Sequence, residues 1–463
     1  MKLRSSSSRS GRRSAVAIAL LVLVAALGVA VWGALRQGPA PSISIETERP
    51  AIGASTRVTA RFAEPRGGLG AVKLELLQGD RTVVLGERVF ARPGAYALGG
   101  AVTPEASIEA VIGRKAQEWL KEGQATLRAT ADRMAGPLRS PSPVTVERTL
   151  AVRLRPPALA VLSSQHHVRQ GGSGMVRLRV GESAARSGVR AGAFESPSAP
   201  LDGGAPGERF VLFAVPWTLA DGNAIRAFAE DDAGNRAEAS FVTTFRPSPP
   251  RLDTIEVSDG FLEKVVPPIA AATEGFDASG SLLEQYVRIN RDLRVANLAE
   301  VARLAGSSEP RFLWRGAFLQ MPNSEKRANF AETRSYRYQG RDVDRQTHLG
   351  LDLASRERDT VPAPNSGRVV LAGWLGIYGN AVAIDHGHGL LTLCGHMSSL
   401  SVTAGDVVKK GQPIGLSGAT GLAGGDHLHL EFFLHGLSVS PIEWLDAHWI
   451  RDALSTKAPV PVE

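Results

Sequence analysis

Short segments in which apolar and polar residues alternate recur along most of this chain. Between residues 43 and 154 they read SISIET, STRVTARF, AVKLELL, RTVVLG and SPVTVERTLAVRLR, with turn residues between them. A period of two places alternate side chains on opposite faces of a β-strand. We therefore predict a β-rich domain over residues 43–154. One run, Ser107–Arg133, is amphipathic without clear alternation, and we predict a helix there.

A second β-rich stretch covers residues 159–245 and ends in a hairpin pattern. Two alternating runs, NAIRAFAE and RAEASFVTTF, flank the sequence DDAGN at residues 231–235, which favours a turn between strands. This pattern resembles the closing hairpin of bacterial immunoglobulin-like domains. The resemblance implies an immunoglobulin-like β domain that serves as a spacer or docking module.

The rest of the chain changes character twice. Residues 252–330 form a mixed helical connecting segment, in which Ser281–Ala305 has apolar positions at the spacing of one or two helices. Short strands and glycine turns return over residues 331–450, and the next helical pattern is Ile442–Leu454. The predicted fold class is therefore mainly β, with an all-β C-terminal domain.

One apolar run near the N-terminus is long enough to cross a membrane. From Ser14 to Leu35 there is no charged residue, and about 22 residues in a helix span roughly 33 Å. Trp32 lies near one end, where aromatic side chains anchor at an interface. We predict a single transmembrane anchor at residues 14–35. The alternative is a long cleaved signal peptide, and both interpretations place the remaining chain outside the cytoplasm.

The basic charge of the chain is concentrated before this run. Lys2, Arg4, Arg9, Arg12 and Arg13 supply +5 of the formal net charge of +7. We predict that this tail, residues 1–13, is cytoplasmic, because basic residues stay on that side of the inner membrane. The chain after the apolar run would then be periplasmic. We expect no nucleic-acid partner, since no basic face interleaved with aromatic residues stands out.

Histidine is concentrated at the other end of the chain. Eight of the ten histidines follow residue 340. The richest clusters read THLGLD (His348, Asp352), CGHM (His396) and DHLHLE (His427, His429). A catalytic zinc site commonly has three protein ligands and one open position. His348, Asp352 and one of the last two histidines would supply such a set.

The spacing of these residues constrains the local backbone. His427 and His429 face the same side of a strand, because they are two positions apart. His348 and Asp352 would be about 13 Å apart on a straight strand, too far to share an ion at about 2 Å. The chain must therefore bend between them, and Gly350 is where we expect the bend.

These clusters and the segments between them resemble the lysostaphin-type (LytM-domain) zinc endopeptidases, which cut bacterial cell-wall peptides. The blocks THLGLDLAS, VPAPNSGRVV, YGNAVAIDHGHGLLT, GHMSSLSVTAGDVVKKGQPIGLSGATG and HLHLEFF follow the family order. The resemblance covers about Arg334 to Leu445, roughly a quarter of the chain.

The resemblance assigns roles to the five residues of the clusters. It implies that His348, Asp352 and His429 bind Zn²⁺ and that His396 and His427 are catalytic without binding it. Zinc would polarise the scissile carbonyl, and the free imidazoles would move a proton or stabilise an oxyanion. The sequence leaves open which of the two is the base.

One position departs from the family pattern. Cys394 stands two residues before His396, where this family usually has tyrosine. It is the only cysteine, so no intrachain disulfide can form. Cys394 and His396 would share a strand face by simple alternation. We favour a packed thiol over a metal ligand, because the ligand set is already complete.

The remaining histidines receive structural assignments. His386 and His388 form a second H-x-H pair, but glycines flank His388 and we expect a β-turn away from the zinc. The others are expected to be structural or exposed: His166, His167, His435 and His448. Asp385 and Glu431 are candidates to orient the ligating histidines, with rim salt bridges as the alternative. The glycine-rich run Gly415–Gly425 lacks a phosphate-loop ending and is expected to be a hairpin loop.

The leading hypothesis is a membrane-anchored periplasmic zinc endopeptidase that hydrolyses the peptide cross-links of peptidoglycan. Its partners would be stem peptides, the inner membrane and a regulatory protein whose identity the sequence does not give. The alternatives are a catalytically silent LytM scaffold that activates other wall hydrolases, and a zinc peptidase with a substrate outside the wall. A further hypothesis is that part of Leu252–Phe330 covers the cleft and restrains activity.

Overall fold

The computed structural model describes residues 9–35, 40–65, 67–91, 102–134 and 142–460. Lys2, Arg4 and residues 36–39, which follow the apolar run, lie outside the described residues. The chain forms two compact units, Met1–Pro156 with Asp231–Asn235, and the remaining residues to Glu463.

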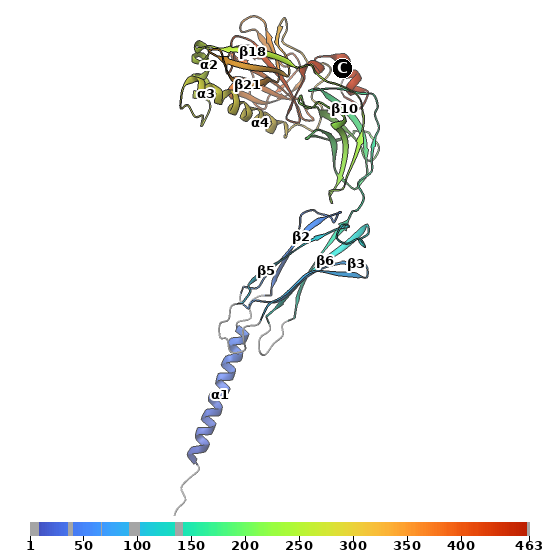
Figure 1. Cartoon of the computed structure of the whole chain (residues 1–463), viewed down its shortest axis with the longest axis vertical. Helices are drawn as coiled ribbons and strands as arrows, with labels where there is room; N and C mark the ends of the chain where they lie inside the picture. The colour runs from blue at the N-terminus through green and yellow to red at the C-terminus, as the bar shows by residue number, and fades with distance from the viewer. Residues whose placement is uncertain (1–8, 36–39, 66, 92–101, 135–141, 461–463) are drawn as a thin grey trace, which may run out of the picture. The chain divides into compact units, whose positions relative to one another are not determined.

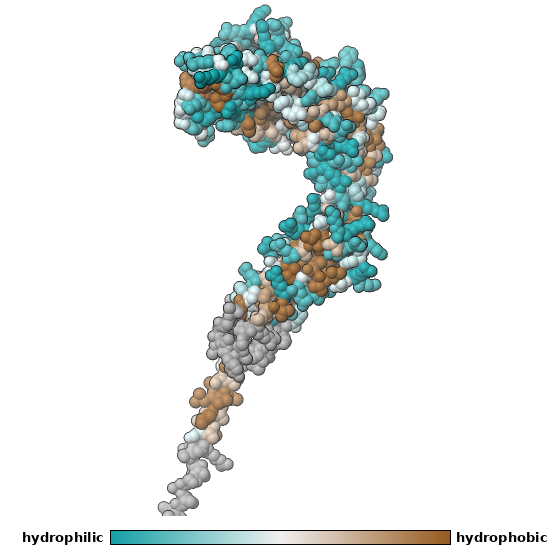
Figure 2. Space-filling view, viewed as in Figure 1, coloured by the Kyte–Doolittle hydropathy of each residue, from teal (hydrophilic) through white to brown (hydrophobic). Residues whose placement is uncertain are grey.

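A single long helix precedes the strands. Helix α1 is Arg9–Leu35, and its uncharged part Ser14–Trp32 is apolar apart from Ser14 (Figure 2). Among the described residues it is the one helix long and apolar enough to cross a membrane, a test that an N-terminal signal sequence also passes.

Seven strands form two sheets over a shared core in the first unit. Their bounds are β1 Ser42–Thr47, β2 Thr56–Ala63, β3 Leu69–Gln78, β4 Arg81–Val89, β5 Glu105–Ile112, β6 Gly123–Arg133 and β7 Val144–Val152. The sheet orders are β1-β2-β5 and β4-β3-β6-β7. Strand β2 illustrates how the sequence pattern forms these sheets. Its buried and less buried positions alternate along its whole length, so one face of the strand lies against the core.

The helix predicted at Ser107–Arg133 is wrong. This run supplies β5 and β6, joined by a turn region at residues 113–122. In β6 the side chains of Ala125, Leu127, Ala129 and Ala131 are buried at every second position. The charged residues of the turn region concealed this period of two.

The first part of the second unit is built on two four-stranded sheets and a smaller sheet of two strands. Its strands are β8 Leu159–Val161, β9 His166–Arg169, β10 Ser173–Val180, β11 Ala184–Ala191, β12 Phe194–Pro197, β13 Ala199–Pro200, β14 Glu208–Ala214, β15 Ile225–Asp231, β16 Arg236–Ser240 and β17 Val242–Arg246. The sheet orders are β13-β14-β10-β8 and β12-β11-β15-β16. Strands β15 and β16 pair as the predicted hairpin around residues 231–235.

Residues 251–328 form several helices and two strands, and the two strands join the sheets of the C-terminal region. The elements are β18 Arg251–Val257, α2 Asp259–Ala272, α3 Leu282–Arg288, the π-helical turn Ile289–Leu293, α4 Arg294–Ala305 and β19 Glu325–Ala328. Helix α3 begins with a capping box between Ser281 and Glu284, which satisfies two free N–H groups. The helical prediction for Ser281–Ala305 is confirmed.

The C-terminal region is built on one large sheet, coloured orange to red in Figure 1. Its strand order is β19-β22-β30-β26-β25-β24-β28, with β31 on β30. Two smaller sheets adjoin it, β18-β20-β21 and β23-β29-β27. The strands are β20 Glu332–Tyr338, β21 Arg341–His348, β22 Leu351–Ala354, β23 Thr360–Pro362, β24 Gly367–Trp374, β25 Asn380–Asp385, β26 Leu390–Met397, β27 Ser399–Leu400, β28 Val407–Val408, β29 Pro413–Leu416, β30 Leu428–Leu434 and β31 Leu437–Val439.

The large sheet is buried on both faces. One face, with Leu430 and Phe432, packs on Trp444 of helix α5 Pro441–Trp444 and on Leu212 of β14. The other face, with Leu393 and Phe433, packs on helices α2 to α4. Side chains at odd-numbered positions of β30 therefore point toward the helices. The predicted helix Ile442–Leu454 is divided into α5, α6 Ala447–Trp449 and a π-helical turn, Ile450–Ser455.

The fold class is mainly β, as predicted. Strands β18 and β19 precede the predicted boundary at residue 331, yet β18 pairs with β20 and β19 pairs with β22. Residues 251–328 thus complete the same sheets that hold the histidine clusters.

Candidate metal centre and its surroundings

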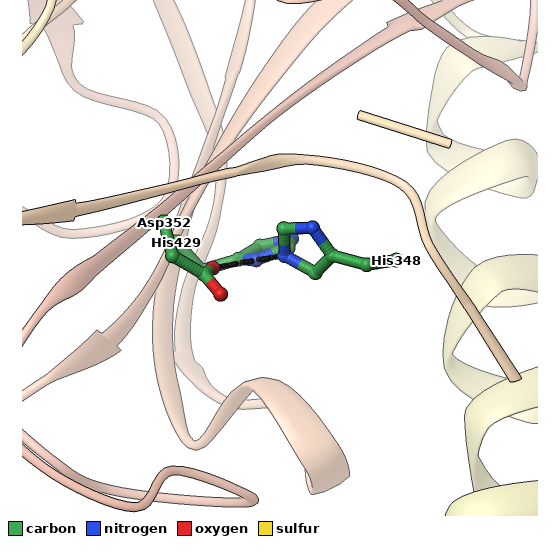
Figure 3. A group of neighbouring side chains, drawn as sticks. All are labelled: His348, Asp352 and His429. Atoms are coloured by element: carbon green, nitrogen blue, oxygen red, sulfur yellow. Dashed lines mark hydrogen bonds and ion pairs between the residues drawn. The ribbon is translucent and has the colours of Figure 1, made fainter. Parts of the chain in front are cut away.

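Three of the predicted site residues converge on one point (Figure 3). His348 ends β21, Asp352 lies in β22 and His429 lies in β30, where it stands directly opposite Asp352. The Nε2 atom of His348 is 2.9 Å from Oδ1 of Asp352 and 3.1 Å from Nδ1 of His429. The Nδ1 atom of His429 is 3.0 Å from the same Asp352 oxygen. The three atoms form a nearly equilateral triangle.

This triangle fits a divalent metal ion. Ligands about 2.0–2.1 Å from a tetrahedral ion lie roughly 3.3 Å from one another, slightly more than the separations here. An ion placed above the triangle would keep its fourth position open. Two imidazoles and one carboxylate are also ligands that zinc prefers. Among the described residues, this is the group of three that could hold a metal.

The backbone between His348 and Asp352 breaks as expected. Strand β21 ends at His348 and β22 begins at Leu351. Gly350 lies in this break, and its role is to leave space. A Cβ atom there would lie 2.6 Å from Cε1 of His429, which real structures do not tolerate. Gly350 therefore permits the close approach of the His429 ring.

Each of the three residues has a second partner that fixes its orientation. The Nδ1–H of His348 donates to the carbonyl of Asn329 over 2.9 Å. The Nε2–H of His429 donates to Oε2 of Glu431 over 3.1 Å. The outer oxygen of Asp352 accepts from Arg334 over 3.2 Å. Such contacts select the tautomer and leave the inner atoms to a metal.

The surroundings of these three residues shift the pKa of each. Burial opposes ionisation of Asp352, but the adjacent His348 and His429 hold the pKa of its carboxyl well below the usual range. Burial lowers the pKa of His348. Burial acts on His429 in the same direction, but Asp352 and Glu431 outweigh it and raise its pKa to about 9. The pair of carboxylates thus favours positive charge at this point, whether a proton or a metal supplies it.

The two predicted catalytic histidines lie beside the triangle. The ring centroids of His396 and His427 are 4.8 Å apart, and the ring centroids of His396 and His429 are 5.8 Å apart. The Nδ1–H of His396 donates to the carbonyl of Thr420, and that of His427 to the carbonyl of Gly425, over 2.8 and 2.9 Å. Both donations leave the Nε2 lone pair free to accept a proton. Burial lowers the pKa of His396 well below its usual value, which keeps that ring neutral.

The expectation that Cys394 and His396 share a strand face is wrong. His396 has a φ of +65°, in the left-handed region, which interrupts the alternation of β26. Its ring therefore turns toward the metal triangle, whereas Cys394 is buried in the apolar core on the opposite face. Burial raises the pKa of this thiol to about 12. Cys394 is a packed residue, as we favoured.

The other histidines lie outside this cluster. The ring of His386 bonds to the carbonyl of Ser366 and the hydroxyl of Thr392. His388 occupies a turn and packs on Phe312. His435 donates to a carbonyl in β14. His166 is buried, and His167 and His448 are exposed.

Of the two candidate orienting carboxylates, only one reaches the triangle. Glu431 does so through His429. Asp385 instead accepts from Ser308 and from the backbone N–H groups of Glu309 and Gly387.

Two side chains near the triangle were missed from the sequence. The buried phenol of Tyr378 packs 5.4 Å from the His429 ring and donates to Oε2 of Glu431 over 2.8 Å. Arg334 comes from β20, which precedes the first cluster. No spacing rule links either residue to the histidines. The glycine-rich run Gly415–Gly425 also supports the site. Its residues Thr420 and Gly425 provide the backbone carbonyls that accept from the rings of His396 and His427.

Residues 346–441 match the model of Peptidase family M23. The C-terminal part of the chain is an M23 peptidase domain. The chain is 40% identical over 96 residues to the murein hydrolase activator EnvC of Escherichia coli, covering 21% of this chain and 23% of EnvC. It is 38% identical over 96 residues to the peptidoglycan DD-endopeptidase ShyA of Vibrio cholerae, covering 21% and 22%.

Among solved structures, the catalytic domain of lysostaphin from Staphylococcus simulans is similar, with 25% identity and a TM-score of 0.21, covering 31% of this chain and 96% of that domain. The match with EnvC and ShyA spans less than a quarter of either relative. One of these relatives is an enzyme and the other an activator, so membership of the family is compatible with both.

Proposed function

We propose that this protein is a membrane-anchored periplasmic zinc endopeptidase that hydrolyses peptide cross-links of peptidoglycan. The observation that carries the proposal is the complete site. His348, Asp352 and His429 form a triangle of metal-binding size, and the imidazoles of His396 and His427 stand beside it. The M23 domain and the wall-directed names of its relatives support the substrate class.

The side chains divide the chemical work. A bound zinc ion would supply Lewis-acid polarisation of the scissile carbonyl and of the attacking water. The free Nε2 of His427 lies 3.6 Å from the inner Asp352 oxygen, within reach of a proton released there. His396, held by the Thr420 carbonyl, faces the same space, and its free Nε2 is a second candidate to accept that proton. Both rings keep their orientation because backbone carbonyls hold them.

The alternative function is a metal-free scaffold that activates other wall hydrolases. The proposal predicts about one zinc per chain and digestion of purified peptidoglycan, and it predicts loss of both in His429→Ala. A matched control is His448→Ala, which removes an exposed imidazole outside the histidine cluster. Undiminished digestion by His429→Ala would refute the proposal that the protein is a zinc endopeptidase. Absence of stoichiometric zinc from the unchanged protein would favour the scaffold.

One contact allows a specific test of the hypothesis that residues 252–330 restrain activity. The Nζ atom of Lys264 in α2 donates to the carbonyl of Gly424 over 3.0 Å, in the loop that also supports His427. Removing residues 1–330 would delete β18 and β19, so a point substitution is the better test. If this contact restrains the loop, Lys264→Ala raises the rate of peptidoglycan digestion. An unchanged rate would dismiss this contact as a restraint.

A further inference from the structure

Thr420, in the glycine-rich run Gly415–Gly425, is joined to His396 by two hydrogen bonds. The Nδ1–H of His396 donates to the carbonyl of Thr420 over 2.8 Å. The N–H of Thr420 donates back to the carbonyl of His396 over 3.4 Å. The glycine-rich run therefore holds both the ring and the backbone of this histidine.

The hydroxyl of Thr420 fixes the same residue to two strands of the large sheet. Its Oγ1 donates to the carbonyl of Met397, the last residue of β26, over 2.9 Å. It also accepts from the N–H of Asn380, the first residue of β25, over 3.0 Å. The hydroxyl thus acts as donor and as acceptor at once. Because the hydroxyl and the carbonyl belong to one residue, the two strands also fix the carbonyl to which His396 donates.

Two glycines allow the run to approach the turn before β25. A Cβ atom at Gly379 would collide with Oγ1 of Thr420, and a Cβ atom at Gly421 would collide with the backbone of Gly379. The N–H of Leu422 also donates to the carbonyl of Ile377 over 2.8 Å. The run and the turn therefore pack backbone against backbone, and Thr420 lies where they meet.

His396 requires such support because of its backbone conformation. Its φ of +65° lies in the left-handed region, which residues other than glycine seldom adopt unless surrounding contacts hold them there. In this conformation the ring lies beside His429. The bond from Nδ1–H to the Thr420 carbonyl selects the tautomer whose Nε2 lone pair is free.

We propose that Thr420 is a positioning residue for the hydrolysis of the peptide bond, and that its hydroxyl fixes the carbonyl that orients the His396 ring. Thr420 acts through His396, which faces the space beside the metal triangle. This inference rests on the proposed function, because it requires that His396 moves a proton during that reaction.

The test compares kcat and KM for hydrolysis of a soluble cross-linked stem peptide by the full chain. Thr420→Val keeps the shape of the side chain and removes both hydrogen bonds of the hydroxyl. It should lower kcat about tenfold, since a general acid or base contributes about 10²–10⁴-fold and a displaced ring loses part of this. KM and zinc content should stay within about twofold of the unchanged protein, because the metal triangle is intact. Thr420→Ser should recover most of kcat.

The matched control is Ser398→Ala. It removes another hydroxyl that holds the glycine-rich run, since Oγ of Ser398 donates to the carbonyl of Ser417 over 2.6 Å. It should leave kcat unchanged. Thr420→Val should still fold, because the Met397 carbonyl also accepts from Nδ2 of Asn380 over 3.2 Å. Thermal unfolding of each variant checks this.

A double-mutant cycle separates positioning from a general structural effect. His396→Ala should lower kcat about 100-fold, and adding Thr420→Val should cost nothing further, because the hydroxyl acts through that ring. Nitrogen NMR of the metal-free protein gives a readout independent of activity. The His396 ring, identified by its absence from His396→Ala, should show one tautomer in the unchanged protein and a mixture of tautomers in Thr420→Val.

The outcomes distinguish this inference from the proposed function. Equal kcat for Thr420→Val and Ser398→Ala, or a further tenfold loss when Thr420→Val is added to His396→Ala, would overturn the role of Thr420 alone. A single unchanged tautomer of His396 in Thr420→Val would overturn it as well. Absence of both zinc and hydrolysis in the unchanged protein would instead overturn the proposed function.

Discussion

Glu431→Gln should weaken zinc binding without disturbing the fold. The side chain is buried, and its carboxylate accepts three hydrogen bonds. Oε2 accepts from His429 and Tyr378, and Oε1 accepts from Ser438 over 2.6 Å. Glutamine has nearly the same shape. Its carbonyl oxygen can keep the first two bonds, while its amide can donate to the Ser438 hydroxyl.

The magnitude follows from the loss of charge. A hydrogen bond to a charged group contributes about 1.5–3 kcal/mol, against about 0.5–1.5 kcal/mol for a neutral one. The difference, about 1–2 kcal/mol for the bond to His429, corresponds to roughly a tenfold change in Kd for zinc. Loss of an outer partner of a metal-bound histidine typically costs about 10–100-fold in affinity. We therefore expect Kd to rise by about tenfold or more.

The assay is competition for zinc against a chromophoric chelator, with thermal unfolding of the metal-free protein measured in parallel. Tyr378→Phe is the matched control, because it removes one donor to Glu431 and leaves the bond to His429 in place. Its effect on Kd should be smaller than that of Glu431→Gln. A zinc Kd for Glu431→Gln within about twofold of the unchanged protein would refute the reasoning that Glu431 supports His429 as a ligand.

Three other predictions concern other groups of the second unit. Arg334→Gln removes the donor to the outer Asp352 oxygen and should raise the zinc Kd about tenfold, with Arg334→Lys intermediate, in the same competition assay. Burial raises the pKa of Glu443 from 4.5 to about 7. Its neutral form therefore stabilises the fold fully below about pH 4.5, and the free energy of unfolding should fall by about 3 kcal/mol as pH rises through about 7. Urea titrations should show this decline in the unchanged protein, whereas Glu443→Gln should flatten it; an equal slope in both would contradict the assignment. Cys394 should resist iodoacetamide at pH 8 in the native protein and react after denaturation, as followed by mass spectrometry, because its thiol is buried and its pKa is about 12. Labelling of the native protein would show that the core opens there.

Much of the fold could be predicted because alternation is a local signal. It indicated the strands before residue 154 and the hairpin β15–β16, and helical spacing indicated α3 and α4. The signal failed at Ser107–Arg133, where a charged turn region separates two strands. Local pattern could not distinguish a charged turn from the polar face of a helix, because both place charges in solvent.

The candidate site likewise contains residues that the sequence predicted and partners that only the structure shows. The order and spacing of the histidine clusters identified five residues, and the structure brings all five together. The partners that tune them come from distant positions: Arg334 from β20, Tyr378 from the turn before β25, and Asn329 through its carbonyl. No spacing rule connects Arg334 or Asn329 to the clusters, and the block that begins at Tyr378 gives no sign of its contact with Glu431, since these residues meet only when the sheet assembles.

The sequence by itself determined the mainly β fold, the apolar N-terminal helix and the identity of the five clustered residues, because these depend on residue type and short spacing. Only the tertiary structure decided which way each side chain faces. A positive φ at His396 turns its ring toward the metal triangle and leaves Cys394 in the core. Pairing of β22 with β30 sets Asp352 opposite His429, and Gly350 gives that ring the space to approach. The physical reason is that a metal site requires separations of about 3 Å between atoms, and strand pairing and packing set such distances between residues far apart in the chain.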